Sequence, residues 1–383
     1  MAVQFTAAGK EREMLNKKNE KRSFLVINPY GIGDVLFTTP VIRNLKDRFP
    51  DSKVYYLCNK RTEFILKNNP LIEKIFIYDR DDSIALSKRS KFAWLRYFTG
   101  FVGEIRREKI DVAFDFSLNT YFGFISFLSG IRDRYGLDYK ERCVFLNHKL
   151  ILESFSKKHV ARYYLDLLTE FGIEPKEAGL EVYCGAKSIE WADAFVKKNG
   201  ISGLVVGIAP MGGESWGSKS YLKRWPPEKF AELINVLIED FNAKVFLFAG
   251  SNEEQDILSI KGRLNHPDKC YEFLGCSFED VIALVDKCSL FIGNDTGLLR
   301  FADALKKKII AFFGPVDENV YGMFPFAGER HQYMTNNIDC RPCYNDFRLN
   351  ECVSGTECLK GISVDQVIES VKKLLKNDTG AKK

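Results

Sequence analysis

The feature that most constrains this chain is the alternation of short apolar runs with amphipathic helical patterns. In the first half, apolar runs of strand length occur at residues 24–28, 54–58, 75–78 and 112–116. Helical patterns follow them at 35–49, 62–68, 92–107 and 119–129. Such alternation is typical of β-α-β units, in which helices cover both faces of a parallel sheet. The sequence therefore predicts an α/β protein.

The alternation softens between residues 141 and 188 and then begins again. The softer region holds a helical pattern at 159–171 and a short strand pattern at 180–183. New strands are predicted at 204–209, 244–249, 290–293 and 308–313, with helices at 227–239, 253–264, 278–286, 298–305 and 364–376. Two successive sets of units predict two Rossmann-like domains, with parallel sheets facing a central cleft.

Length and composition agree with two soluble domains. A chain of 383 residues is too long for one typical core. We expect a disordered charged tail at 1–22, a first domain at 23–186, a second at 187–362, and a C-terminal helix and tail at 363–383. The sequence has no apolar stretch of membrane-span length and no apolar signal region at its start, which favours a cytoplasmic protein.

The net charge of +5 is modest. It fits an anionic substrate or a membrane surface, and it is too small to indicate nucleic acid as a partner.

The first predicted strand leads into a glycine turn with a carboxylate at the start of a helix. Gly31 and Gly33 would let a ligand approach the backbone there. The third glycine of a dinucleotide fingerprint is missing, and the next strand ends at Cys58 and Asn59 without an acidic residue, which disfavours a dehydrogenase. Asp34 is either a helix stabiliser or a catalytic base.

Three loops in the second half follow strands at the edge where open α/β sheets bind ligands. The first loop ends in Lys223 and Arg224, which could meet phosphate oxygens, although a solvated loop explains it equally well. In the second loop, Glu254 could accept hydrogen bonds from a ribose. The pair Ser251 and Glu254 is also a capping box, which needs no ligand.

The third loop places small polar residues and a glycine, residues 293–300, at a helix start. Backbone N–H groups and the helix dipole favour an anion at such a position. Asp295 as a plain N-cap is the alternative. Three such loops on one edge suit a nucleoside diphosphate better than three independent caps would.

Four segments in register resemble glycosyltransferase family 9, the ADP-heptose:lipopolysaccharide heptosyltransferase family. They are GIGDVLFTTPVIRNLKDRFPDSKV, KRWPPEKFAELI, FAGSNEEQDI and NDTGLLRFADALKKKIIAFFGPVD. The resemblance spans residues 24–376 and implies a GT-B fold. It also implies a heptose or related sugar moved from an ADP-sugar to a lipopolysaccharide-core or similar glycan acceptor, and no required cofactor.

The resemblance also implies roles for single residues. Asp34 matches the proposed catalytic base, Lys223 the lysine at the nucleotide phosphates, and Glu254 the ribose-binding glutamate. The loop that holds the donor nucleotide is matched by Asp295, Thr296 and Gly297.

The chain departs from the family at two positions. Arg300 replaces a common histidine, and arginine can meet phosphate but cannot act as an acid or base near neutrality. Phe37 stands where a polar residue is common.

The family inverts the anomeric centre, so Asp34 would take a proton from the acceptor hydroxyl. Two alternative functions stay open: a transferase of the same family that uses another nucleotide sugar, and a protein that binds nucleotide sugars without transferase activity.

Two stretches mix basic and aromatic residues. They are residues 88–98 and 121–127, the latter followed by Arg132 and Arg134. Such a helix could lie on an anionic membrane that presents a lipid-linked acceptor. A helix packed on the sheet with a solvated basic face is the alternative.

Ten cysteines are present, and four of them cluster near the C-terminus as Cys340, Cys343, Cys352 and Cys358. Four thiolates could bind a structural zinc ion. The spacing is not that of a standard zinc ribbon, so a structural loop or two oxidisable pairs are the alternatives.

Overall fold

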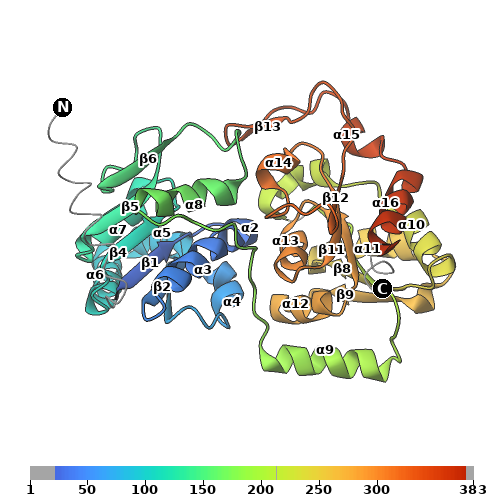
Figure 1. Ribbon diagram of the computed structural model, residues 1–383, viewed down its shortest axis with the longest axis horizontal. Coiled ribbons are helices and arrows are strands. Elements are labelled where there is room, and N and C mark those ends of the chain that lie inside the picture. Colours follow the sequence, from blue (N-terminus) through green and yellow to red (C-terminus); the bar gives the residue numbers. More distant parts are fainter. Residues whose placement is uncertain (1–21, 213, 377–383) are drawn as a thin grey trace. The chain divides into compact units, whose positions relative to one another are not determined.

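The computed structural model describes residues 22–212 and 214–376 of the chain (Figure 1). The predicted charged tail therefore lies outside the described residues, apart from Arg22. The chain divides into two compact units, residues 1–179 and 180–383. This division falls shortly before the boundary at residue 186 that the sequence pattern suggested, and the C-terminal helix is part of the second unit.

The first unit contains a six-stranded sheet in which every neighbouring pair is parallel. Its strands are β1 (Ser23–Ile27), β2 (Lys53–Cys58), β3 (Lys74–Ile77), β4 (Val112–Asp115), β5 (Asp133–Tyr139) and β6 (His148–Leu152). They lie in the order β3-β2-β1-β4-β5-β6. The central strands β1 and β4 are almost entirely buried, because helices cover both of their faces.

The helices of the first unit connect these strands. They are α2 (Ile32–Leu36), α3 (Thr39–Arg48), η1 (Lys60–Thr62), α4 (Glu63–Leu66), α5 (Arg80–Arg89), α6 (Lys91–Arg107), α7 (Thr120–Leu128) and α8 (Val160–Glu170). One core contains buried residues of α6 and α7 packed on the sheet. Helices α3 and α8 pack against each other, and Phe24 of β1 contacts Phe49 and Phe171 at their ends.

The second unit repeats the same arrangement. Its sheet contains β7 (Val205–Ala209), β8 (Lys244–Ala249), β9 (Cys270–Leu274), β10 (Leu290–Asn294), β11 (Lys308–Phe312) and β12 (His331–Met334). The order is β12-β11-β10-β7-β8-β9, again with every pair parallel. Each unit therefore has the strand order of a Rossmann fold.

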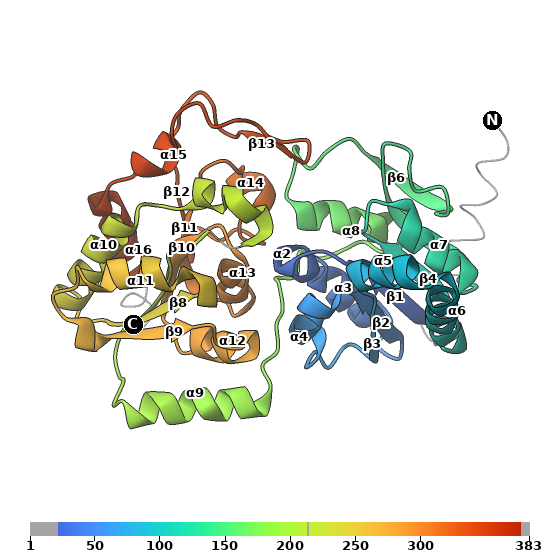
Figure 2. The same cartoon turned by 180° about the vertical axis from the view of Figure 1, so that it is seen from behind.

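Helices cover both faces of the second sheet (Figures 1 and 2). One core includes residues of α10 (Pro227–Glu239), α11 (Glu254–Lys261) and α16 (Val364–Lys376). The other includes residues of α9 (Ala186–Lys198), α12 (Phe278–Asp286) and α13 (Gly297–Ala304). Shorter elements are η2 (Glu214–Lys223), η3 (Ser251–Glu253), η4 (Pro267–Lys269), α14 (Glu318–Tyr321), α15 (Glu357–Lys360), β13 (Tyr344–Asn345) and β14 (Arg348–Leu349).

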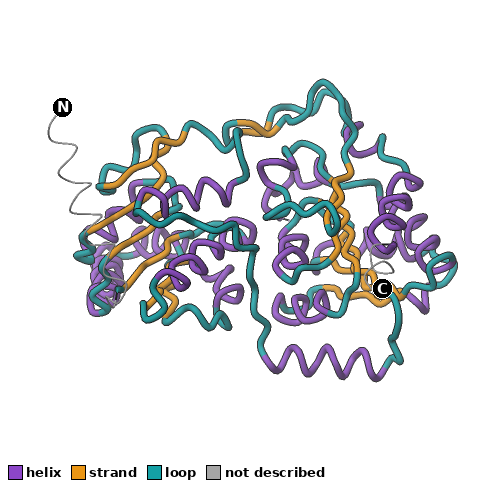
Figure 3. The backbone as a smooth tube through the Cα atoms, viewed as in Figure 1, coloured by secondary structure: helices purple, strands orange, loops and turns teal. Residues whose placement is uncertain are grey.

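Several elements differ from the sequence prediction (Figure 3). The predicted strand at 180–183 is an extended connection without ladder bonds. The predicted helix at 35–49 is two helices that join near Phe37 and Thr38. Within residues 22–212 and 214–376, no helix is both long and apolar enough to cross a bilayer.

Candidate active site

Each sheet has one point where the strand order reverses. In the first unit this point lies between β1 and β4, and in the second between β7 and β10. Loops that leave the carboxyl ends of these strands form the usual ligand site of an open α/β sheet. The turn with Asp34 follows β1, and the loop with Asp295 follows β10. The topology thus places Asp34 and Asp295 at the two switch points.

Three charged side chains meet at the switch point of the second unit. The Lys223 Nζ lies 2.7 Å from Asp295 Oδ2, and the Arg300 Nη2 lies 2.5 Å from Asp295 Oδ1. All three residues are buried, with Lys223 only 8% exposed. The Lys223 ammonium also lies 4.4 Å from the ring centre of Trp216. We call Lys223, Asp295 and Arg300 the charged cluster.

The charged cluster carries one more positive than negative charge. Burial alone would raise the pKa of Asp295, but the Lys223 ammonium and the Arg300 guanidinium outweigh it and lower that pKa below its ordinary value. Asp295 is therefore ionised at neutral pH, and the two cations exceed it by one charge. An anion at this place would complete the balance.

Arg300 uses its guanidinium within the protein. Besides the Asp295 carboxylate, it donates to the backbone oxygens of Gly322, at 3.0 Å, and of Tyr321. Sequence reasoning expected Arg300 to meet phosphate directly. The contacts instead make it a support for Asp295 and for the end of α14.

Thr296 is the N-cap of α13, a position that sequence reasoning gave to Asp295 as the alternative. Its side chain makes no capping bond, and its Oγ1 is buried without a hydrogen-bond partner among the described residues. Gly297 is the first residue of the helix. A buried hydroxyl beside a helix N-terminus and a net positive charge is the chemistry that an anionic ligand needs.

The loop that carries Lys223 is fixed to the core. The Trp225 N–H donates to Asn294 Oδ1 at 3.0 Å, and Asn294 Nδ2 donates to the Pro210 backbone oxygen at 2.6 Å. The Trp225 ring is fully buried and stacks on Phe312 at 4.5 Å. Lys223 is thus held by neighbours that have little freedom to move.

The loop after β8 differs from the predicted capping box. Glu253, not Glu254, closes the turn, because its Oε2 accepts the Gly250 N–H at 2.9 Å. Glu253 also lies 3.4 Å from Arg224, which pairs in turn with Asp256 at 2.9 Å. Arg224 is therefore used within the protein. Glu254 is exposed at the first position of α11, where the capping role no longer accounts for it.

In the first unit, Asp34 lies half-buried in the first turn of α2. Its Oδ2 accepts the Gly31 N–H at 3.2 Å, so Asp34 does stabilise the start of the helix, as one of the two interpretations of the sequence expected. Neither Gly31 nor Gly33 has a left-handed backbone, and a Cβ on Gly31 would stand at an ordinary 3.5 Å from Asp34. The Gly31 position would therefore accept a Cβ without a clash.

Neighbouring strand ends brace this turn from two sides. Asn59, after β2, donates to the backbone oxygens of Pro29 and Tyr30 at 2.6 and 2.8 Å. On the other side, the Tyr30 hydroxyl donates to the Ser117 backbone oxygen after β4. Asn28 Nδ2 donates to the Asp34 backbone oxygen at 3.0 Å. The position of Asp34 is therefore set by strands on both sides of β1.

Sequence reasoning missed a second carboxylate at the same edge. Asp115 ends β4 and is 2% exposed. Its Oδ1 accepts the Ser117 N–H at 2.8 Å, and its Oδ2 has no partner among the described residues. Burial raises the pKa of Asp115 to about 6. The only sequence signal was an acid at the end of an apolar strand.

A buried acid and histidine lie behind the charged cluster and were also missed. His331 Nε2 is 3.4 Å from Asp303 Oδ1, on the helix that carries Arg300. Burial lowers the pKa of His331 to about 3 and raises that of Asp303 to about 7. His331 is therefore neutral at pH 7, and this contact is not an ion pair.

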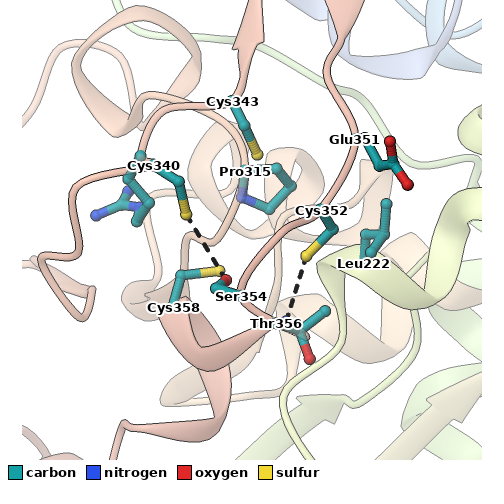
Figure 4. Close-up of a pocket in the computed structure, with 10 residues that line it drawn as sticks. Leu222, Pro315, Cys340, Cys343, Glu351, Cys352, Ser354, Thr356 and Cys358 are labelled. Carbon is teal, nitrogen blue, oxygen red and sulfur yellow. Dashed lines mark hydrogen bonds between the residues drawn. The ribbon is translucent and has the colours of Figure 1, made fainter.

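The four C-terminal cysteines line one small pocket with Leu222 and Pro315 (Figure 4). The cavity volume is about 10 Å³, which is room for roughly one water molecule. All four are free thiols, and burial raises the pKa of Cys358 to about 11. No group of three or more His, Cys, Asp or Glu residues in the described part of the chain is arranged to hold a metal. The structural zinc ion that the four cysteines could have bound therefore has no support from the geometry of the described residues.

Comparison with known proteins agrees with this architecture. Residues 100–353 match the family model of glycosyltransferase family 9 (heptosyltransferase). Lipooligosaccharide heptosyltransferase 2 of Haemophilus influenzae is 24% identical over 308 residues, which cover 76% of this chain and 83% of that protein.

Two solved structures share the fold. The family 9 glycosyl transferase of Veillonella parvula has a TM-score of 0.76 at 19% identity, over 93% of this chain and 98% of that one. The ADP-heptose LPS heptosyltransferase II of E. coli has a TM-score of 0.70 at 18% identity, over 93% and 99%. These likenesses confirm the GT-B fold.

Two Rossmann-like units with polar loops at both switch points have the GT-B fold, and the family model makes the chain a glycosyltransferase of that class. Within that class, the chain belongs to glycosyltransferase family 9. The resemblance drawn from the four sequence segments is thereby confirmed.

Proposed function

We propose that the enzyme moves a heptose, or a closely related sugar, from an ADP-sugar to a lipopolysaccharide-core or similar glycan acceptor. The observation that carries this proposal is the charged cluster with its net positive charge. It stands beside the N-terminus of α13 and the unpartnered Thr296 hydroxyl. A diphosphate supplies the anion that this arrangement lacks. The heptosyltransferases that share the family supply the sugar and acceptor classes.

The donor site would use groups that keep hydrogen-bonding capacity. The Lys223 ammonium has three N–H donors and directs two of them at the Asp295 backbone and side-chain oxygens, so one remains for a phosphate oxygen. The Thr296 hydroxyl and the first N–H groups of α13 would complete the phosphate contacts. Glu254, exposed beside the end of β8, would accept the ribose hydroxyls.

Asp34 would serve as the general base of an inverting transfer. Its carboxylate takes the proton of an acceptor hydroxyl while that oxygen attacks the anomeric carbon from the face opposite the phosphate. The bond from the anomeric carbon to the phosphate oxygen breaks, and the nucleoside diphosphate leaves with the electron pair. Lys223 and the start of α13 stabilise the charge that grows on the leaving phosphate. No step needs a metal or cofactor.

The acceptor is expected to be lipid-linked or an oligosaccharide, and we propose that transfer takes place in the cytoplasm. The enzyme would then work next to the membrane face that holds such an acceptor. Nucleic acid is not among the proposed partners.

The direct test is transfer from ADP-heptose to a truncated lipopolysaccharide-core acceptor, followed by mass spectrometry of the product. Asp34→Asn should lower the rate by about 10²- to 10⁴-fold with unchanged ADP affinity, because only the proton transfer is lost. Asp47→Asn, an exposed acid on α3, is the matched control and should keep wild-type activity. Near-normal turnover in Asp34→Asn would refute the assignment of the base.

The same assay separates the alternative functions. Turnover only with another nucleotide sugar would keep the reaction class and replace the donor. Donor binding without transfer or donor hydrolysis, with any sugar, would identify a binding protein instead of an enzyme.

A further inference from the structure

A surface that the transfer mechanism does not use lies at the junction of α5 and α6. Three apolar side chains there are exposed: Phe92 at 78%, Leu95 at 51% and Ile84 at 41%. Phe92 and Leu95 are three residues apart on one helix, so they share a face. Large apolar side chains exposed together usually mark a contact surface.

The same surface is basic. Four exposed cations accompany the apolar side chains: Lys88, Arg89, Lys91 and Arg96. No ion pair within the described part of the chain engages them, and residues 83–103 contain no Asp or Glu. The acidic residues of α5 stand at its opposite end, where Asp79 caps the helix. We call Ile84, Phe92, Leu95 and these four cations the α5–α6 tip.

The α5–α6 tip is held rigidly. The Trp94 indole N–H donates to Ser83 Oγ of α5 at 3.0 Å, and its ring stacks on Phe98 at 5.3 Å. The exposed side chains are thus not presented by a loose loop. They project from two helices that are pinned to each other.

The tip stands at the edge of the sheet that carries Asp34. Tyr78 directly follows β3, and its ring contacts Tyr97 and Phe101 of α6 at 5.9 and 4.9 Å. The carboxyl edge of the sheet is therefore level with Tyr97, and residues 91–96 extend beyond it by about 9 Å. All strands of this sheet are parallel, so the Asp34 turn after β1 lies at the same edge.

We infer that the α5–α6 tip docks on an anionic lipid surface, with Phe92 and Leu95 entering the interface and the four cations meeting the headgroup phosphates. This inference rests on the proposed function, because docking here would bring a lipid-linked acceptor to the Asp34 edge. The charge favours this occupant over a second copy of the chain, since two such basic surfaces repel each other.

Vesicle flotation with the full-length protein tests the inference without any need for turnover. Vesicles with about a third phosphatidylglycerol should bind the wild-type protein, whereas phosphatidylcholine vesicles should bind much less. Lys88→Ser with Lys91→Ser should weaken binding at least ten-fold, because each cation near an anionic surface contributes about a five-fold factor. Phe92→Ser with Leu95→Ser should also weaken binding at least ten-fold.

Matched control variants make the same kinds of substitution at exposed positions outside the α5–α6 tip. Ile151→Ser removes an exposed apolar side chain of β6, and Lys197→Ser with Lys198→Ser removes a pair of exposed cations of α9. Both should float like the wild type. Equal flotation of the tip variants and the wild type would overturn the inference, as would equal binding to neutral vesicles. If the protein floats as expected but transfers no sugar, the proposed function fails and the docking surface stands.

Discussion

The Asp295 carboxylate offers a demanding test of the charged cluster, because it is the counter-ion of two buried cations. Asp295→Asn keeps the shape and removes the charge, so the Lys223 and Arg300 charges lose their partner. Breaking a buried ion pair in this way costs about 3–5 kcal/mol of unfolding free energy. For a unit of this size, that loss should lower the melting temperature by about 6–20 °C.

The assay is thermal unfolding at pH 7 with a surface pair as control. Glu73→Gln breaks the pair of Lys53 and Glu73, whose side chains are 57% and 49% exposed, and should cost at most about 1 kcal/mol. Adding Lys223→Met to Asp295→Asn should restore part of the loss, because one uncompensated cation is removed. A melting temperature of Asp295→Asn within the range of Glu73→Gln would refute the view that this carboxylate balances a buried charge.

Two further predictions concern the Thr296 hydroxyl and the Asp303 carboxyl, both of which are buried. Thr296→Val removes a hydroxyl without an internal partner, so the melting temperature should change little while ADP binds about five-fold more weakly, as measured by calorimetry. Equal ADP affinity would show that the hydroxyl meets no ligand. Asp303 has a pKa raised to about 7, so its protonated form stabilises the fold at low pH, and this contribution fades as the pH rises from about 4 to about 7. Asp303→Asn should therefore gain unfolding free energy relative to the wild type across that interval in urea titrations. A constant difference at all pH values would contradict the raised pKa.

The sequence predicted the central strands well, because a parallel strand covered on both faces must be apolar throughout. Four strands of the two large sheets were not predicted: β6, β9 and β12 at sheet edges, and β5 beside β6. β9 and β12 have mixed burial and read as CYEFL and HQYM, which lack a continuous apolar run. Residues 180–183 have the pattern of a strand, although none of the described residues pairs with them in a ladder. Side-chain pattern alone does not reveal whether a ladder partner exists.

The loops at the carboxyl edges were also predictable, because glycine and small polar residues directly after a strand are typical of the ligand-binding loops of this fold. The contacts within them were not. Glu253 instead of Glu254 caps its turn, and Arg300 binds Asp295 and two backbone carbonyls, which the expected contact with phosphate did not foresee. Asp115 and the pair of Asp303 and His331 depend on burial by segments distant in sequence. Such partnerships become visible only when the fold is known.

Calorimetry of ADP binding to the full-length protein tests the central claim most directly. Lys223→Ala should weaken ADP at least ten-fold, because a charge-assisted bond to a phosphate oxygen contributes about 1.5–3 kcal/mol. Lys219→Ala, an exposed lysine four residues earlier in the same loop, should bind ADP like the wild type. ADP binding by Lys223→Ala that equals the wild type, or no ADP binding by the wild type, would contradict a nucleoside diphosphate site at the charged cluster.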